Sequence, residues 1–164
     1  NWPIAGPGGG GPGSEGLAMT AWCHGAPGIA LAKAFALDIL PQEAMLSEIE
    51  AALRTTADAP RHQADHVCCG NLGRCEALFT AGHRVSAPWA VAAARRIAAH
   101  VTEQAAKRGH FRLSAGGFEY LVFDPGFFRG LSGIGYQLLR MAAPSSLPSV
   151  LAFEAGPSLT AGGV

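Results

Sequence analysis

The sequence predicts an all-α fold built from repeated helix pairs, and three observations support this prediction. Alanine, the best helix former, supplies much of the hydrophobic share of 49%. Apolar residues recur at spacings of three and four along several segments, which is the period of an amphipathic helix. The motif G-x-x-G followed by an apolar run occurs three times, at Gly25, Gly70 and Gly130. These copies predict an inner layer of glycine-led helices that pack closely.

The first two predicted helices are delimited by proline and by an apolar stripe. Pro27 is favoured at a helix start and Pro41 stops the run, so the first helix is expected over 27–40. The second is expected over 42–57, as an outer helix, on a stripe formed by Leu46, Ile49 and Leu53.

Three further segments complete the expected order of elements. A third helix is predicted over 71–81, and an outer fourth helix over 87–107 has a stripe formed by Val91, Ala94, Ala98, Val101 and Ala105. Residues 109–127 combine glycines, aromatics and β-formers, which predicts an irregular loop or a short hairpin. A last glycine-led helix is expected over 131–143, ending before a proline.

Composition indicates one folded unit and excludes several function classes. We expect a flexible Gly/Pro-rich segment over 1–16, the folded unit over 17–154 and a loose tail over 155–164. Twelve acidic and twelve basic residues without a basic run argue against a nucleic-acid partner. No stretch is apolar enough for a membrane span. Four cysteines are too few for a disulfide scaffold, so we expect a cytoplasmic protein.

Three of the four cysteines stand just before glycine-led helices: Cys23 in the first copy, and Cys68 and Cys69 in the second. If the inner helices begin at one rim, these thiols meet at helix N-termini, where the helix dipole favours thiolates. Three thiolates suit Zn²⁺ and leave its fourth tetrahedral position open. Spacing alone leaves two alternatives, small buried residues or a Cys68–Cys69 disulfide. Cys75, inside a helix, is expected to be a small buried residue.

Several polar residues near these cysteines have more than one interpretation. His24 is next to Cys23 and can supply a proton near neutral pH, or it can be a solvated rim residue. His66 is a weaker candidate for a ligand or a supporting group. Asn71 is expected to cap the third helix, although it can also orient the site. The other histidines are expected to be solvated: His62, His83, His100 and His110.

The segments "TAWCHGAPGIALA", "HVCCGNLGRCEAL" and "RGLSGIGYQLLRMAAPSSLPSVLAFE" resemble the last three inner-helix segments of the LanC-like lanthionine synthetase cyclase domain. Cys-Cys-Gly, with "NWP" upstream, is most similar to the C-terminal part of class II lanthipeptide synthetases (LanM type). The resemblance covers roughly residues 17–154. It implies a partial α/α toroid, about three inner/outer helix pairs of a larger ring, with zinc held by Cys23, Cys68 and Cys69.

The resemblance also implies a reaction and a partner. The family adds a cysteine thiol of a dehydrated precursor peptide to dehydroalanine or dehydrobutyrine, closing a thioether ring in lanthipeptide (lantibiotic) biosynthesis. His24 is then the candidate catalytic group that protonates the resulting enolate. The family's earlier helix pairs and a dehydratase domain are absent from this sequence, so we expect activity only with the missing cyclase or dehydratase portions. The alternatives are a non-catalytic zinc- and thiol-binding module and an inactive truncated fragment.

Overall fold

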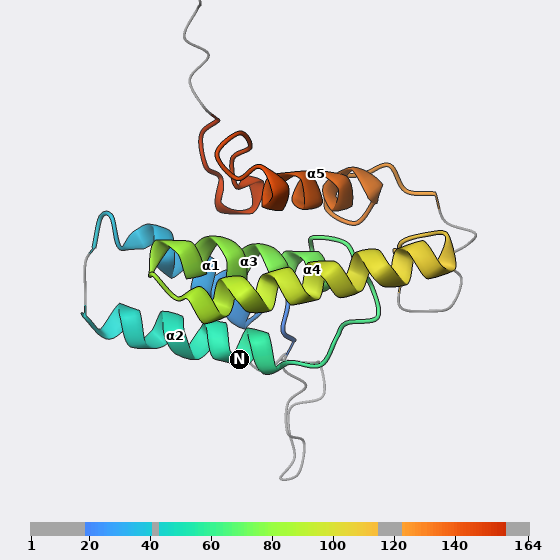
Figure 1. The fold of residues 1–164 in the computed structure, drawn as a ribbon. Coiled ribbons are helices and arrows are strands. Elements are labelled where there is room, and N and C mark those ends of the chain that lie inside the picture. Colours follow the sequence, from blue (N-terminus) through green and yellow to red (C-terminus); the bar gives the residue numbers. More distant parts are fainter. Residues whose placement is uncertain (1–18, 41–42, 115–122, 157–164) are drawn as a thin grey trace, which may run out of the picture.

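The computed structural model describes residues 19–40, 43–114 and 123–156, and over these ranges it is all-helical (Figure 1). Its elements are five α-helices and one short 3-10 helix: α1 (Ala26–Ala36), α2 (Glu43–Asp58), α3 (Asn71–Arg84), α4 (Pro88–Arg108), α5 (Leu131–Ala142) and η2 (Val150–Ala152). No β-strand forms within these ranges. The predicted all-α class is therefore confirmed.

Helix α3 lies at the centre of the fold. It contacts α1, α2, α4 and α5, and α1 also packs against α2. Figure 1 shows α1 and α3 between α5 on one side and α2 and α4 on the other. The glycine-led helices α1, α3 and α5 thus follow one another through direct contacts, while α2 and α4 cover α1 and α3 from outside. This arrangement agrees with a partial α/α toroid.

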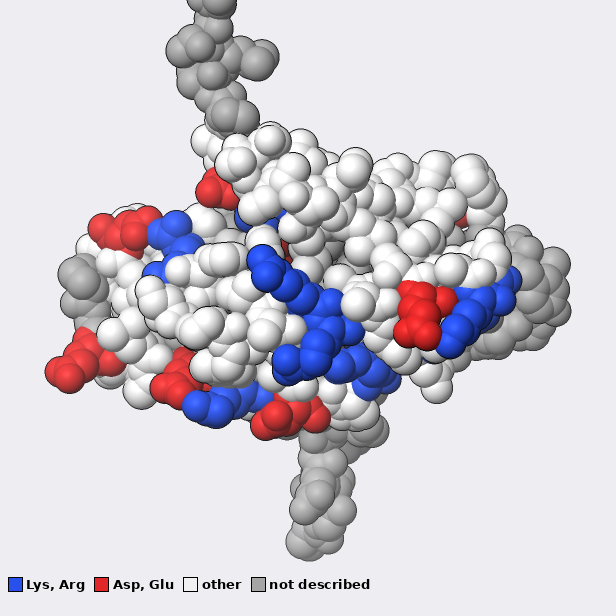
Figure 2. Space-filling view, viewed as in Figure 1, with Lys and Arg blue, Asp and Glu red and all other residues white. Residues whose placement is uncertain are grey.

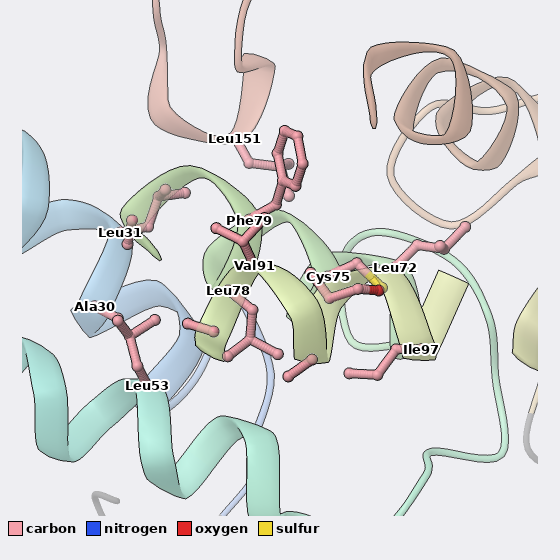
Figure 3. Packing of buried hydrophobic residues seen from close by; sticks show 14 of the residues in the cluster. Ala30, Leu31, Leu53, Leu72, Cys75, Leu78, Phe79, Val91, Ile97 and Leu151 are labelled. Carbon is pink, nitrogen blue, oxygen red and sulfur yellow. The ribbon is translucent and has the colours of Figure 1, made fainter. Parts of the chain in front are cut away.

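The core is densest around α3 because this helix has neighbours on all sides. Every residue of 71–82 is buried, although α3 has no strongly apolar face. Figure 3 shows side chains of α3 meeting those of α1, α4 and η2 in one cluster, in which Leu72, Cys75 and Leu78 are fully buried. Burial of these apolar side chains is the main force that holds the helix pairs together.

Helix α1 is shorter than the predicted 27–40. It ends at Ala36 and passes into turns, in which Ile39 is 80% exposed and Leu40 is 57% exposed. The backbone N–H groups of Asp38 and Ile39 donate to carbonyl oxygens three residues earlier, so the helix tightens into turns after Ala36. The residue before a proline is also disfavoured in a helix, which excludes Leu40. The long apolar run therefore does not continue as a helix to its end.

The outer helices have nearly the predicted bounds, with one difference in the stripe of α2. Ile49 and Leu53 are fully buried, but Leu46 is 49% exposed because it lies near the start of the helix.

The predicted loop or hairpin over 109–127 shows no strand in residues 109–114 and 123–127, and its middle, 115–122, lies outside the described residues.

Charged side chains are unevenly distributed over the surface. On the face drawn in Figure 2 they lie over α2, over α4 and near the end of α1, whereas the part of this face that covers α5 is almost uncharged. The one charged residue of α5, Arg140, is buried.

Among the described residues, no helix has the length and hydropathy required to cross a membrane. The predicted segment 1–16 and residues 157–164 of the predicted tail lie outside the described ranges.

Candidate metal centre

A tight turn with the same close backbone approach precedes each glycine-led helix, although Gly25 has a positive φ of 119° where the Gly70 and Gly130 backbones are extended. The second glycine of each motif lies under the carbonyl oxygen of the residue six positions before it, so that a Cβ atom would overlap this oxygen; the pairs are Gly28 with Trp22, Gly73 with Val67 and Gly133 with Phe127. Only glycine permits such a close approach. The G-x-x-G motif is therefore a steric requirement of this turn.

The three turns place residues in equivalent positions. The first position holds Cys23, Cys68 or Phe128, and the second position, one residue further along the chain, holds His24, Cys69 or Arg129. The third turn lacks cysteine but contacts the other two. The Cys68 backbone N–H donates to the Phe128 carbonyl oxygen at 2.9 Å. The Trp22 ring stacks on the Phe128 ring, with 5.6 Å between ring centroids. The third turn thus supports the two that carry thiols.

The structure brings together the three cysteines that were predicted as metal ligands. The Sγ atoms of Cys23, Cys68 and Cys69 all lie within 4.8 Å of one another. Cys69 Sγ is 3.4 Å from Cys23 Sγ and 3.4 Å from Cys68 Sγ. All three are free thiols, so the disulfide alternative does not apply here. Thiolates about 2.3 Å from a tetrahedral zinc ion are about 3.8 Å apart, a value that lies between the two 3.4 Å spacings and the 4.8 Å limit on all three.

The chemistry of the donor set also fits a thiophilic cation. Partial burial, with a smaller contribution from the Cys69 thiol, raises the pKa of the Cys23 thiol, and burial together with the neighbouring thiols raises the pKa of the Cys68 thiol to about 12. Three adjacent thiolates are unfavourable because each repels the others. A divalent ion among them removes that repulsion, and sulfur ligands favour Zn²⁺ over hard cations such as Mg²⁺. The residues present therefore fit zinc.

Cys75 lies apart from this cluster. Its side chain is fully buried in the core between α3 and α4, and its Sγ contacts the Ala94 carbonyl oxygen at 3.5 Å (Figure 3). Burial raises the pKa of its thiol above the usual range. Cys75 is therefore a small packed residue, as predicted.

The loop that carries Cys68 and Cys69 is held by Asn71, the first residue of α3. Its side-chain oxygen accepts the His62 backbone N–H at 2.8 Å, and its side-chain nitrogen donates to the His62 carbonyl at 2.9 Å and to Asp65 at 3.1 Å. It makes no capping bond to α3, where Gly70 is the N-cap. The predicted capping role is wrong, and Asn71 instead orients the loop.

Asp65 is a supporting residue that the sequence analysis missed. It is fully buried, accepts the Arg112 backbone N–H at 2.9 Å and pairs with the guanidinium groups of Arg112 and Arg108 at 3.3 and 3.4 Å. These bonds tie the cysteine loop to the end of α4 and the segment after it. The only sequence signal was a single acidic residue between histidines, which does not identify partners more than forty residues away.

The histidines near the thiols have different surroundings. His24 is partly exposed, but its Nε2 atom is buried and has no hydrogen-bond partner among the described residues. His66 is buried, and its Nδ1 atom accepts the Cys69 backbone N–H at 3.3 Å, so it supports the second turn from outside the thiol cluster. His62 was expected to be solvated; instead it is partly buried, and its Nδ1 accepts the Ala64 N–H at 3.0 Å.

Acidification is expected to destabilise this loop. Burial lowers the pKa of His62 and His66, and nearby Arg74 and Arg129 respectively lower it further. The unfolded chain, with histidine pKa values of about 6.5, therefore binds protons more readily than the folded chain. The stability contributed by these neutral rings is complete above about pH 6.5 and is lost as the pH falls below it. Urea unfolding at about pH 7.5 and about pH 5.5 measures the loss.

Matched substitutions assign this pH dependence to the loop. His62→Gln is expected to reduce the difference in unfolding free energy between the two pH values, whereas His100→Gln, at an exposed position of α4, leaves it unchanged. Equal stability of the unsubstituted chain at both pH values would contradict the prediction.

Comparison with known families gives one match. The model of a family described as lanthionine synthetase C-like protein matches residues 1–152. This range covers most of the chain and contains all four cysteines and His24. No curated protein matches the sequence.

Proposed function

The chain belongs to the lanthionine synthetase C-like family, and on this basis we propose that it forms the thiol-activating centre of a lanthionine cyclase. The observation that carries the proposal is the cluster of Cys23, Cys68 and Cys69 thiols in a chain of this family. Zn²⁺, when bound, supplies a Lewis acid and an open position for a substrate thiol, whose pKa it lowers. The proposed substrate is a dehydrated precursor peptide of lanthipeptide biosynthesis.

The proposed reaction is an addition in which no atom is lost. The sulfur of a peptide cysteine forms a bond to the β-carbon of dehydroalanine or dehydrobutyrine. The electron pair of the carbon–carbon double bond moves toward the adjacent carbonyl group and gives an enolate. The α-carbon then accepts a proton, so that overall one hydrogen moves from the thiol to the α-carbon and a thioether ring closes.

The residues of the centre have separate roles in this proposal. Cys23, Cys68 and Cys69 hold the metal ion. His24 donates the proton to the enolate, because it is next to Cys23 and its Nε2 atom has no hydrogen-bond partner among the described residues. Trp22, stacked on Phe128, holds the backbone immediately before Cys23 in place.

Further helix pairs are part of the proposal. Three glycine-led helices cover only part of a closed ring, and apolar side chains remain exposed at both edges of the layer: Ile39 after α1 is 80% exposed and Leu139 on α5 is 63% exposed. Apolar positions of this kind favour association with other helices. We place the chain in the C-terminal part of a class II synthetase, where cyclase and dehydratase portions supply the remaining parts.

Zinc content tests the proposed centre. The unsubstituted chain is expected to bind about one zinc ion, and Cys23→Ala, Cys68→Ala and Cys69→Ala are each expected to lose most of it, because a structural or catalytic zinc site needs at least three protein ligands. Cys75→Ala is the matched control and keeps its zinc. The measurement is elemental analysis after gel filtration, with circular dichroism to verify folding.

The outcomes separate the proposed function from its alternatives. Unchanged zinc content in all three variants would overturn the assignment of the site. Zinc binding that depends on the three cysteines, without ring closure when the remaining synthetase portions are supplied, would favour the non-catalytic zinc- and thiol-binding module.

A further inference from the structure

An apolar groove of about 570 Å³ opens beside Cys23. Its walls come from the turn before α1, from α1 itself and from η2, and the residues that matter here are Trp22, Cys23, Ile29, Phe35, Leu151 and Phe153. None of the described residues that line the groove carries a charge. The groove and the thiol cluster share Cys23.

Phe153 forms an unusual rim of this groove. Its side chain is 85% exposed, and its backbone lies in the left-handed region, at φ 56° and ψ 32°, which is costly for a residue other than glycine. Three hydrogen bonds fix the turn: Phe153 N–H to Val150 O at 3.1 Å, Glu154 N–H to Ser149 O at 3.0 Å, and Ser149 N–H to the Glu154 carboxylate at 2.7 Å. The chain therefore holds an aromatic ring in the solvent on a fixed turn.

Trp22 forms the opposite wall and joins the groove to the metal centre. Its ring Nε1–H donates to the Leu151 carbonyl oxygen at 3.0 Å, and its ring stacks on Phe128. The next residue along the chain is Cys23. These bonds fix the aromatic walls of the groove and the Cys23 thiol relative to one another. Neither the walls nor the thiol therefore needs to rearrange when a ligand binds.

We propose that this groove binds an aromatic or large apolar side chain of the substrate peptide, next to or one residue beyond the cysteine whose thiol reacts. This inference rests on the proposed function and adds a sequence preference to it. The short distance follows from the groove beginning at Cys23, because successive Cα atoms of a peptide are 3.8 Å apart. An uncharged groove with aromatic walls favours an aromatic side chain over a polar one through burial and ring contacts.

Capped dipeptides test the proposed preference on the zinc-loaded chain. The probes are acetyl-Cys-Phe-amide and acetyl-Cys-Gly-amide, with their Ser analogues, and ligand-observed NMR gives the dissociation constants. The phenylalanine peptide of each pair is expected to bind about tenfold more tightly than the glycine peptide. Phe153→Ala is expected to reduce this ratio to about twofold in both pairs without a change in zinc content.

A matched control makes the result specific to the groove. Phe123 is 79% exposed and does not line the groove, so Phe123→Ala keeps the tenfold ratio. Equal binding of the phenylalanine and glycine peptides, or a ratio that survives Phe153→Ala, would overturn the inference. Loss of the preference when the remaining synthetase portions are supplied is the result expected if further helices of the ring cover the groove, and it would also overturn the inference. The serine peptides lack a thiol, so their ratio tests the groove even if the zinc centre fails its own test.

Discussion

Gly73→Ala is expected to destabilise the fold by about 1–3 kcal/mol and to weaken zinc binding, although alanine is the better helix former. The added Cβ atom would overlap the carbonyl oxygen of Val67. This oxygen belongs to the backbone, so the overlap is relieved only if the whole turn moves. The residue that follows Val67 in the sequence is Cys68. When the turn moves, the Cys68 thiol must move with it, away from Cys23 and Cys69.

Two measurements and one control check this expectation. Urea unfolding reports the stability, and competition with a chelator reports the zinc affinity. Gly135→Ala is the control, because a Cβ atom at this position of α5 meets no other atom within 4 Å. It is expected to stabilise the chain by about 0.5–1 kcal/mol and to leave zinc affinity unchanged. A Gly73→Ala chain with unchanged stability and zinc affinity would show that the turn does not require the close approach.

The fold class and the order of the helices were predictable because their signals are local. A G-x-x-G motif followed by an apolar run is a local signal, and its three copies predicted three glycine-led helices that begin at Gly25, Gly70 and Gly130. Helix bounds were less predictable where competing local effects overlap. The apolar run before Pro41 was expected to be helical to its end, but α1 ends at Ala36.

The thiol cluster was also predictable, because the repeated frame assigns equivalent positions to residues far apart in sequence. Cys23 and Cys68 share one position of the turn, and Cys69 occupies the next. The family resemblance implied the same three residues as ligands, and the match to the family model confirms the family. Their role as zinc ligands remains a prediction until the metal content is measured.

The polar supports of the site were not predictable from local patterns. Asp65 binds Arg112, which is 47 residues away, and a lone aspartate in a loop indicates no such partner. Phe153 belongs to the rim of a groove only because η2 folds back onto α1, a contact between opposite ends of the chain. Contacts of this kind depend on the packed fold, and neither hydrophobic periodicity nor motif spacing reports them.

Glu76 is a further buried support, and it joins α3 to α5 and to the segment that leads to η2. Its carboxylate is 1% exposed and accepts four donors: Gln137 at 2.6 Å, Arg140 at 3.0 Å, Ser149 at 2.5 Å and Thr80 at 2.7 Å. A buried carboxylate is tolerated because these donors replace its hydration. The same bonds add to the apolar packing of Ile134 in holding α5 against α3.

Glu76→Ala is therefore expected to destabilise the chain by about 3–5 kcal/mol, the usual cost of removing one partner of a buried ion pair. Arg140 would stay buried, with Glu154 at 3.8 Å as its remaining acidic neighbour, and Ser149 would lose its acceptor at the start of the turn that presents Phe153. Urea unfolding measures the loss. A surface variant, Glu103→Ala, removes an exposed pair with Lys107 and should show no measurable change.

A double-mutant cycle separates the buried charge from simple loss of packing. If the cost of removing Glu76 comes mainly from leaving Arg140 without its carboxylate, then Glu76→Met combined with Arg140→Met is expected to be more stable than Glu76→Met alone, because an apolar pair of similar volume needs no charged partner. A double variant as unstable as the sum of the two single variants would assign the cost to packing. A Glu76→Ala chain as stable as Glu103→Ala would show that the network does not hold α5 in place.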